Sequence, residues 1–316
     1  MIPVIAIVLP CYNEEEILPI TVRELLTLLD RMSGDGMISH DSFLLCSNDG
    51  SNDSTWSVIR ELHAKDRRVK GISLAHNCGH QNALFAGLMA VKDSCDAAIS
   101  IDADLQDDPT AIIRMVEKFC DGKEIIYGVR HERTVDNWFK RASAHGFYSF
   151  QKAMGVDTIY DHADYRLMSS RALNLLSEYG ESNLFLRGIV TRIGLDSDIV
   201  TYSRGRRVAG ESKYPLSKML GFAIDGITSF SAKPMRIVFF MGLGLLILDI
   251  LVALYVIWSI IFSDNLEAGW ASLMLSIWFL GSLILMAIGV VGEYIGKIFI
   301  EVKKRPRYAI RDILFD

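Results

Sequence analysis

The chain has 316 residues, of which 50% are hydrophobic, and a formal net charge of −5 at pH 7. This length allows one large domain or two ordinary ones. The negative net charge gives no reason to expect nucleic-acid binding, since nucleic-acid-binding proteins present basic surfaces to phosphate. The five cysteines are scattered and form no C-x-x-C pair. They favour reduced thiols in a cytosolic domain over a disulfide framework.

Short apolar runs alternate with helical patterns over the first 130 residues. The run at residues 4–9 follows no positively charged segment and is cut short by Pro10, so it predicts a buried strand rather than a signal peptide. Further strands are predicted at residues 43–46, 69–74, 97–101 and 124–127, with helices between them. This alternation predicts a Rossmann-like α/β domain, in which helices cover both faces of a mostly parallel sheet.

Polar motifs follow the first four predicted strands. They are Pro10-Cys-Tyr-Asn-Glu14, the segment 48–55 (Asn-Asp-Gly-Ser-Asn-Asp-Ser-Thr), His76-Asn-Cys-Gly-His80, and the pair Asp102 and Asp104. Ligands of such sheets collect at the carboxyl ends of the strands. The four motifs are therefore expected to meet at one edge of the sheet and to form a binding site.

Asp102 and Asp104 are two residues apart at the end of an apolar run. In an extended backbone their carboxylates project to the same side. Such a pair suits a hard divalent cation that is shared with substrate phosphates. The alternative is an acidic turn that caps a helix starting near Pro109. The strand-end position favours the site, while glycosyl, nucleotide and metal chemistry all stay open.

The C-terminal part of the chain predicts a membrane hairpin. Two apolar segments, 235–262 and 271–299, are long enough to span a bilayer, and the loop 263–270 between them has no Lys or Arg. Basic residues before the first span and in the tail 300–316 place the N-terminal domain and both termini in the cytoplasm. The amphipathic segment 215–234 predicts an interfacial helix. Asp249, inside the first span, is expected to contact another subunit or to be protonated.

Six motifs in order carry a resemblance to a known family. They are Pro10-Cys-Tyr-Asn-Glu14, Asn48-Asp-Gly-Ser51, Asp102-Ala-Asp-Leu-Gln-Asp107, Tyr127-Gly-Val-Arg130, Asp164-Tyr-Arg-Leu167 and Gly210-Glu-Ser-Lys-Tyr214. With the hairpin, they make the chain resemble the family 2 glycosyltransferases of GT-A fold that act on polyprenyl phosphates. Within that family the chain is similar to the bactoprenol glucosyltransferase branch, whose relatives include dolichol-phosphate mannose synthase. The resemblance implies a GT-A domain at residues 1–214 and inverting transfer of a sugar, with glucose favoured, from a UDP-sugar to polyprenyl phosphate.

The resemblance also implies the site residues. Mg²⁺ or Mn²⁺ would be held by Asp102 and Asp104. Catalytic roles would fall to Asp102, Asp104, Asp164 and Arg207. The nucleotide sugar would be bound by Pro10, Tyr12, Asn13, Glu14, Asp49, Asp102, Gln106 and Asp107. The acceptor phosphate would be bound by Arg130, Arg141, His145, Arg207 and Lys213.

Several of these residues have a purely structural alternative. The segment from Asn48 is also a good turn sequence, Arg141 could be a solvated charge, and His145 could be a structural histidine. Asn48 stands where many relatives have Asp, and its neutral side chain disfavours a charge-dependent role of that position. Arg166 could simply pair with Asp164 and brace its loop.

Other functions compete with this interpretation. GDP-mannose, UDP-N-acetylglucosamine and aminoarabinose donors stay open, because one or two loop residues can decide the sugar. A processive polysaccharide synthase is disfavoured, because the chain has neither a Gln-x-x-Arg-Trp motif nor further spans. A noncatalytic membrane scaffold is disfavoured by the intact aspartates and cations. The spacing Gly292-x-x-x-Gly296 suits close helix packing and leaves a homo-oligomer open.

Overall fold

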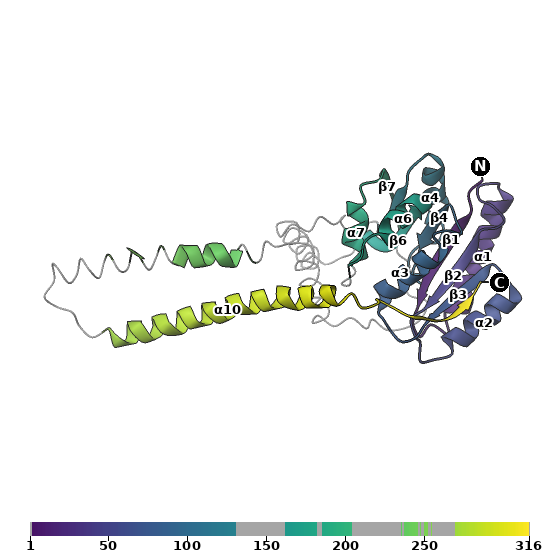
Figure 1. Ribbon diagram of the computed structural model, residues 1–316. Helices are drawn as coiled ribbons and strands as arrows, with labels where there is room; N and C mark the ends of the chain where they lie inside the picture. The colour runs from purple at the N-terminus through teal and green to yellow at the C-terminus, as the bar shows by residue number, and fades with distance from the viewer. Residues whose placement is uncertain are drawn as a thin grey trace. The chain divides into compact units, whose positions relative to one another are not determined.

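The computed structural model describes residues 2–130, 162–181, 185–203, 235, 237–245, 247, 250–251, 254 and 269–315. The chain divides into two compact units. The α/β unit comprises Met1–Tyr148, Asp157–Pro215 and Arg305–Asp316, and the helical unit comprises Ser149–Val156 and Leu216–Lys304. Figure 1 shows the sheet and covering helices of the first unit and the long helix of the second.

A single sheet of eight strands forms the centre of the α/β unit, in the order β7-β5-β6-β4-β1-β2-β3-β8. The strands are β1 (Ile5–Cys11), β2 (Phe43–Asn48), β3 (Val69–Leu74), β4 (Ala97–Ser100), β5 (Ile125–Arg130), β6 (His162–Ser169), β7 (Ser197–Tyr202) and β8 (Ile310–Leu314). β1 to β4 run parallel to their neighbours among themselves, which confirms the predicted mostly parallel core. β6 enters antiparallel between β4 and β5, and β7 pairs parallel with β5.

Pro10 is tolerated in the central strand β1 because the pairing of β1 with β4 ends before this residue. The carbonyl of Val8 faces β4, since it accepts the Ile101 N–H at 3.1 Å. Pro10 lies two residues further on and therefore faces the same side. Pairing between β1 and β4 ends at Val8, so the missing N–H of Pro10 breaks no bond of that ladder.

Helices cover both faces of the sheet (Figure 1). They are α1 (Leu18–Gly34), α2 (Thr55–Lys65), α3 (His80–Val91), α4 (Ala111–Cys120), α6 (Ser170–Ser177) and α7 (Leu186–Arg192). Ile5, Ile7 and Leu9 of β1 point to one face and share a buried core with apolar residues of α1, α2 and α4. Val8 points to the other face, where a Cβ on Gly87 of α3 would lie only 2.5 Å from Val8 Cγ1. Gly87 therefore lets α3 lie close to the sheet.

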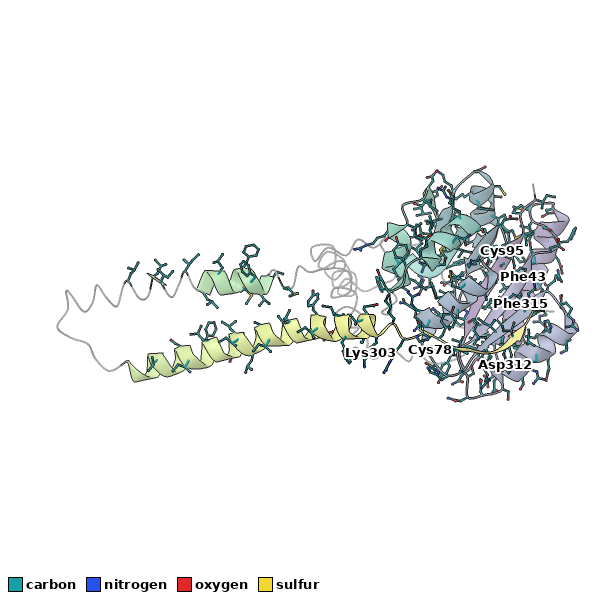
Figure 2. The ribbon with its side chains drawn as sticks, in the orientation of Figure 1. Phe43, Cys78, Cys95, Lys303, Asp312 and Phe315 are labelled. Carbon is teal, nitrogen blue, oxygen red and sulfur yellow. The ribbon has the colours of Figure 1, made fainter. Side chains whose placement is uncertain are left out.

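The C-terminal tail forms part of this sheet. β8 pairs antiparallel with β3, and Ala75 N–H donates to the Ala309 carbonyl at 2.8 Å. Lys70 Nζ lies 4.2 Å from the ring centroid of Phe43 and 5.2 Å from that of Phe315; Figure 2 labels both rings. The sequence predicts only a basic cytosolic tail here, so β8 is an addition that the tertiary structure reveals.

The helical unit contains α10 (Trp270–Lys303). Its segment Phe279–Lys303 contains an 18-residue stretch with a mean hydropathy of 2.0 and is long and apolar enough to cross a membrane; it is the one such helix among the described residues. The helix covers the second predicted span. Residues 237–245 of the first predicted span are helical. The interfacial segment 215–234 and Asp249 lie outside the described residues, so the two-span hairpin stays a prediction.

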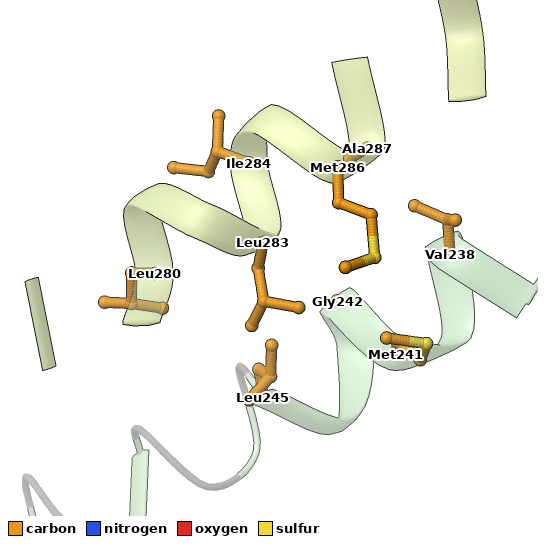
Figure 3. A pocket seen from close by; sticks show the side chains of 9 residues that line it. All are labelled: Val238, Met241, Gly242, Leu245, Leu280, Leu283, Ile284, Met286 and Ala287. Carbon is orange, nitrogen blue, oxygen red and sulfur yellow. The ribbon is translucent and has the colours of Figure 1, made fainter. Parts of the chain in front are cut away.

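An apolar cavity of about 270 Å³ lies within the helical unit, between residues 238–245 and α10. Figure 3 shows its lining, in which no side chain is charged: Val238, Met241, Gly242, Leu245, Leu280, Leu283, Ile284, Met286 and Ala287. This composition matches the apolar surroundings expected of helices that lie in a membrane.

Candidate functional site

The loops after β1 and β2 are fastened to each other by hydrogen bonds. Asn13 N–H donates to Ser51 Oγ at 3.0 Å, and Asn13 Oδ1 accepts the Asn52 N–H at 2.9 Å. Glu14 N–H donates to Thr55 Oγ1 at 2.9 Å. Asn13 holds a left-handed backbone with a φ of 56°, a conformation that Asn tolerates better than most residues. The structure thus joins two of the four predicted strand-end motifs.

Asp49 joins the second motif to the third. Its carboxylate is buried and accepts the backbone N–H groups of Cys78 at 2.7 Å and Gly79 at 3.0 Å. Burial raises the pKa of Asp49, against the lowering effect of these two hydrogen bonds. The adjacent Gly50 has a φ of 57°, and a Cβ there would lie 2.5 Å from the carbonyl carbon of His76. The turn that presents Asp49 therefore requires glycine.

The aspartate pair lies directly after β4, at the same edge of the sheet. Asp102 is partly buried, and its pKa is raised, first because the surrounding protein limits its hydration and then because Asp164, Asp107 and Asp104 are close. Asp104 Oδ1 accepts the Gln106 N–H at 3.2 Å. Leu105, between them, has a φ of 54°. The segment after β4 is therefore a turn rather than the extended backbone that the sequence predicts, and the shared direction of the two carboxylates stays a prediction.

Asp164 lies on β6, the antiparallel neighbour of β4, and is surrounded by cationic side chains. Arg166 Nη2 donates to its Oδ1 at 2.5 Å, and Arg187 of α7 contacts both oxygens at 3.3 and 3.2 Å. Burial by itself raises the pKa of Asp164, but Arg187, Arg166 and His80 outweigh burial and lower it. The pairing of Arg166 with Asp164, which the sequence offered as an alternative, is present, but both residues lie in strand β6 and not in a loop.

Asp107 and Arg130 contact each other. Asp107 is 2% exposed, accepts the Tyr202 hydroxyl at 2.8 Å and lies 3.4 Å from Arg130 Nη2. Tyr202 also meets the ring of Tyr165 edge to face, with ring centroids 5.1 Å apart. The buried carboxylate therefore ties β7 and the end of β5 to the loop after β4. Sugar binding by Asp107 and phosphate binding by Arg130 stay predictions.

The other predicted site residues fall into two groups. Pro10 is buried in β1, while Tyr12 is 42% exposed beside the site. Arg141, His145, Arg207 and Lys213 lie outside the described residues. The prediction omitted His80, Arg187 and Tyr202, which contact site carboxylates in the structure. His80 belongs to a polar motif that follows a predicted strand, and this position could have identified it as a site residue. Arg187 and Tyr202 lie in segments that carry no such motif.

The carboxylates fit a metal that is shared with a substrate. Within the described part of the chain, no group of three or more His, Cys, Asp and Glu side chains could hold a metal ion by itself. Mg²⁺ at phosphate sites commonly takes only one or two protein carboxylates and fills its shell with substrate phosphates and water. Asp102 and Asp104 supply that number, and the crowding of carboxylates around Asp102 favours a cation there.

An open α/β sheet with polar loops and an aspartate pair at its strand ends defines a protein of GT-A-like fold. The chain belongs to glycosyl transferase family 2, whose family model matches residues 6–194. It is therefore a glycosyltransferase.

Relatives match nearly the whole chain. The uncharacterized glycosyltransferase YkoT of Bacillus subtilis (strain 168) is 49% identical over 98% of this chain and 91% of its own length. The bactoprenol glucosyl transferase of Shigella phage SfII is 38% identical over 97% of each chain. Among solved structures, mannosyl-3-phosphoglycerate synthase from Rubrobacter xylanophilus is 14% identical, has a TM-score of 0.50 and covers 74% of each chain. This last similarity concerns the fold alone.

Proposed function

We propose that the protein transfers glucose from UDP-glucose to a polyprenyl phosphate at the cytosolic face of the cell membrane. The observation that carries the proposal is the match to bactoprenol glucosyl transferases, which covers 97% of the chain and so includes the apolar C-terminal helix as well as the α/β unit. A transferase that modified only soluble acceptors would not need that helix.

The donor nucleotide would bind over the joined loops after β1 and β2. Tyr12 offers an exposed ring at this edge, and Asn13 and Glu14 lie in a loop held by hydrogen bonds. Asp49 already accepts two backbone N–H groups. A carboxylate has about four acceptor positions, which leaves capacity for a hydrogen bond from the uracil ring. A preformed loop of this kind lowers the entropy cost of binding.

Asp102 and Asp104 would hold Mg²⁺ or Mn²⁺ against the diphosphate. The bound ion would neutralise the charge that develops as the nucleoside diphosphate leaves. Gln106 is fixed beside Asp104 through its backbone N–H and would contact the same diphosphate. The protein's own part in this step is to present two carboxylates at one strand end in a fixed arrangement.

The acceptor would be a phosphate, which is an anionic nucleophile at neutral pH and needs no strong general base. The chain must instead bring two anions together, which requires cations. Arg207 and Lys213, with Arg141 and His145, are proposed for this role on the family resemblance, together with Arg130. Asp164 is proposed to orient the sugar or acceptor, because Arg166 and Arg187 keep it ionised and in place. Attack opposite the leaving group would invert the anomeric centre.

Incubation of the membrane-embedded protein with labelled UDP-glucose, polyprenyl phosphate and Mg²⁺ tests the proposal. Label is expected in the lipid phase, and a panel with GDP-mannose, UDP-N-acetylglucosamine and UDP-aminoarabinose identifies the sugar. Absence of labelled lipid with every donor would contradict the proposal and favour a noncatalytic scaffold.

Two variants sharpen the experiment. Asp104→Ala is expected to abolish transfer while the protein still folds and inserts. Asp93→Ala is the matched control, because its side chain is 75% exposed and lies before β4, at the opposite end of that strand from the site. Equal transfer by both variants would remove the aspartate pair from the reaction.

A further inference from the structure

His80 lies between two carboxylates of the site. It is the first residue of α3, its Nε2 is 3.6 Å from Asp102 Oδ1 and 3.7 Å from Asp164 Oδ2, and its side chain is 40% exposed. Asp102 follows β4 and Asp164 lies on β6, and these two strands are antiparallel neighbours. The imidazole therefore stands within ion-pair distance of the aspartate proposed to hold a metal and of the aspartate proposed to orient the sugar.

The backbone around His80 is held on both sides. The preceding residues Cys78 and Gly79 donate their N–H groups to Asp49, and Gly79 takes a φ of 89°. The following residue Gln81 accepts the Leu186 N–H of α7 through its Oε1 at 3.0 Å. His80 is thus carried by a segment that is tied to the loop after β2 and to α7.

Asp164 is the fixed partner of His80. Arg166, 1% exposed, and Arg187 both contact its carboxylate, and Ser100 Oγ donates to its backbone carbonyl at 2.5 Å. Asp102, by contrast, has His80 as its one partner within ion-pair distance among the described residues. A series of contacts therefore runs from Arg166, which is buried, and Arg187, which is partly exposed, through Asp164 and His80 to Asp102.

We propose that His80 is a positioning residue for the metal-binding aspartate: it orients Asp102 from the fixed carboxylate of Asp164. The inference rests on the proposed function, in which Asp102 and Asp104 hold the ion. A carboxylate has two oxygens, so Asp102 can face His80 through one and a cation through the other. Groups that orient metal ligands in this way typically contribute about 10- to 100-fold to metal affinity.

Mn²⁺ binding to the full-length protein with UDP present, followed by electron paramagnetic resonance of the free ion, tests the proposal without any transfer reaction. His80→Ala is expected to raise the Kd for Mn²⁺ by about 10- to 100-fold. His80→Gln, which keeps a nitrogen donor at similar reach, is expected to recover part of the loss. His40→Ala is the matched control, because His40 is an exposed histidine that lies before β2, at the opposite end of that strand from the site, and it is expected to keep the wild-type Kd.

A second readout separates positioning from folding. The thermal unfolding temperature of His80→Ala is expected to stay near that of the wild type, and transfer is expected to recover at saturating Mn²⁺. Wild-type Mn²⁺ affinity in His80→Ala would overturn the proposal, as would an equal loss in His40→Ala or a wild-type protein that binds no Mn²⁺.

The two proposals can fail separately. Normal glucose transfer by the wild type together with unchanged Mn²⁺ affinity in His80→Ala would overturn only the role of His80. Absence of transfer with every donor, together with a weakened Mn²⁺ affinity in His80→Ala, would overturn only the proposed reaction.

Discussion

Replacing Arg166 by Met tests whether the buried pair with Asp164 holds the site together. The Arg166 side chain is 1% exposed, that of Asp164 is 8% exposed, and they meet at 2.5 Å. Removing one partner of a buried ion pair typically costs about 3–5 kcal/mol, because the remaining charge stays buried. Arg187, which contacts Asp164 at 3.2 Å, is retained in this variant, so we expect the lower end, about 3 kcal/mol.

The loss is measured by thermal unfolding of the full-length protein in detergent, followed by circular dichroism. A domain of 150–250 residues loses about 2–4 °C in Tm for each kcal/mol, so Arg166→Met should lower the Tm by about 6–12 °C. The double variant Asp164→Leu with Arg166→Met should recover much of the loss, because it leaves no deeply buried charge without a partner; Arg187, which also contacts Asp164, is 39% exposed and can be hydrated.

Arg171→Met is the control for this experiment. Arg171 pairs with Glu124 at 2.8 Å, but its side chain is 69% exposed, and exposed pairs are worth about 0–1 kcal/mol. The reasoning is refuted if Arg166→Met lowers the Tm no more than Arg171→Met does, or if the double variant is less stable than the single one.

Three further predictions concern backbone strain, pH and metal. A left-handed backbone costs a residue with a side chain about 1–2 kcal/mol. Gly50→Ala should destabilise the protein by more than this, because its Cβ would also lie 2.5 Å from the backbone of His76. Gly36→Ala, with a φ of 73° and no atom within 4 Å of its Cβ, should cost only the energy of the left-handed backbone, so equal shifts in Tm for the two variants would contradict this. Arg68 lowers the pKa of Asp66. This contact therefore stabilises the fold above the unfolded carboxyl pKa of about 4, and its contribution is lost as the pH falls through the lower folded pKa. Asp66→Asn should lose less Tm than the wild type between about pH 6 and pH 3, and parallel plots of Tm against pH for the two proteins would contradict this. Chelation by EDTA should stop glucose transfer, and added Mn²⁺ should restore it; transfer that continues in EDTA would remove the metal from the mechanism.

Much of the fold could be predicted from local patterns. The apolar runs and the helical segments between them predict β1 to β5 and α1 to α4, because strand and helix periodicity is a property of neighbouring residues. The rule that parallel strands end at one edge then brings together the four polar motifs. The structure confirms this in the contacts between Asn13 and Ser51 and between Asp49 and Gly79.

The residues themselves determined that the chain forms a parallel α/β core, places Asp49, Asp102 and Asp104 at one edge, and carries a long apolar segment before its basic tail. Only the tertiary structure decided that β8 completes the sheet, that Tyr202 meets Asp107, and that His80 lies between Asp102 and Asp164. These contacts join residues far apart in the chain; Tyr202 and Asp107 are 95 positions apart. A local pattern carries no signal for them, since they depend on how the strands are ordered and which side chains face each other. The sequence predicts the aspartate pair, but it does not predict the side chains that contact this pair in the fold.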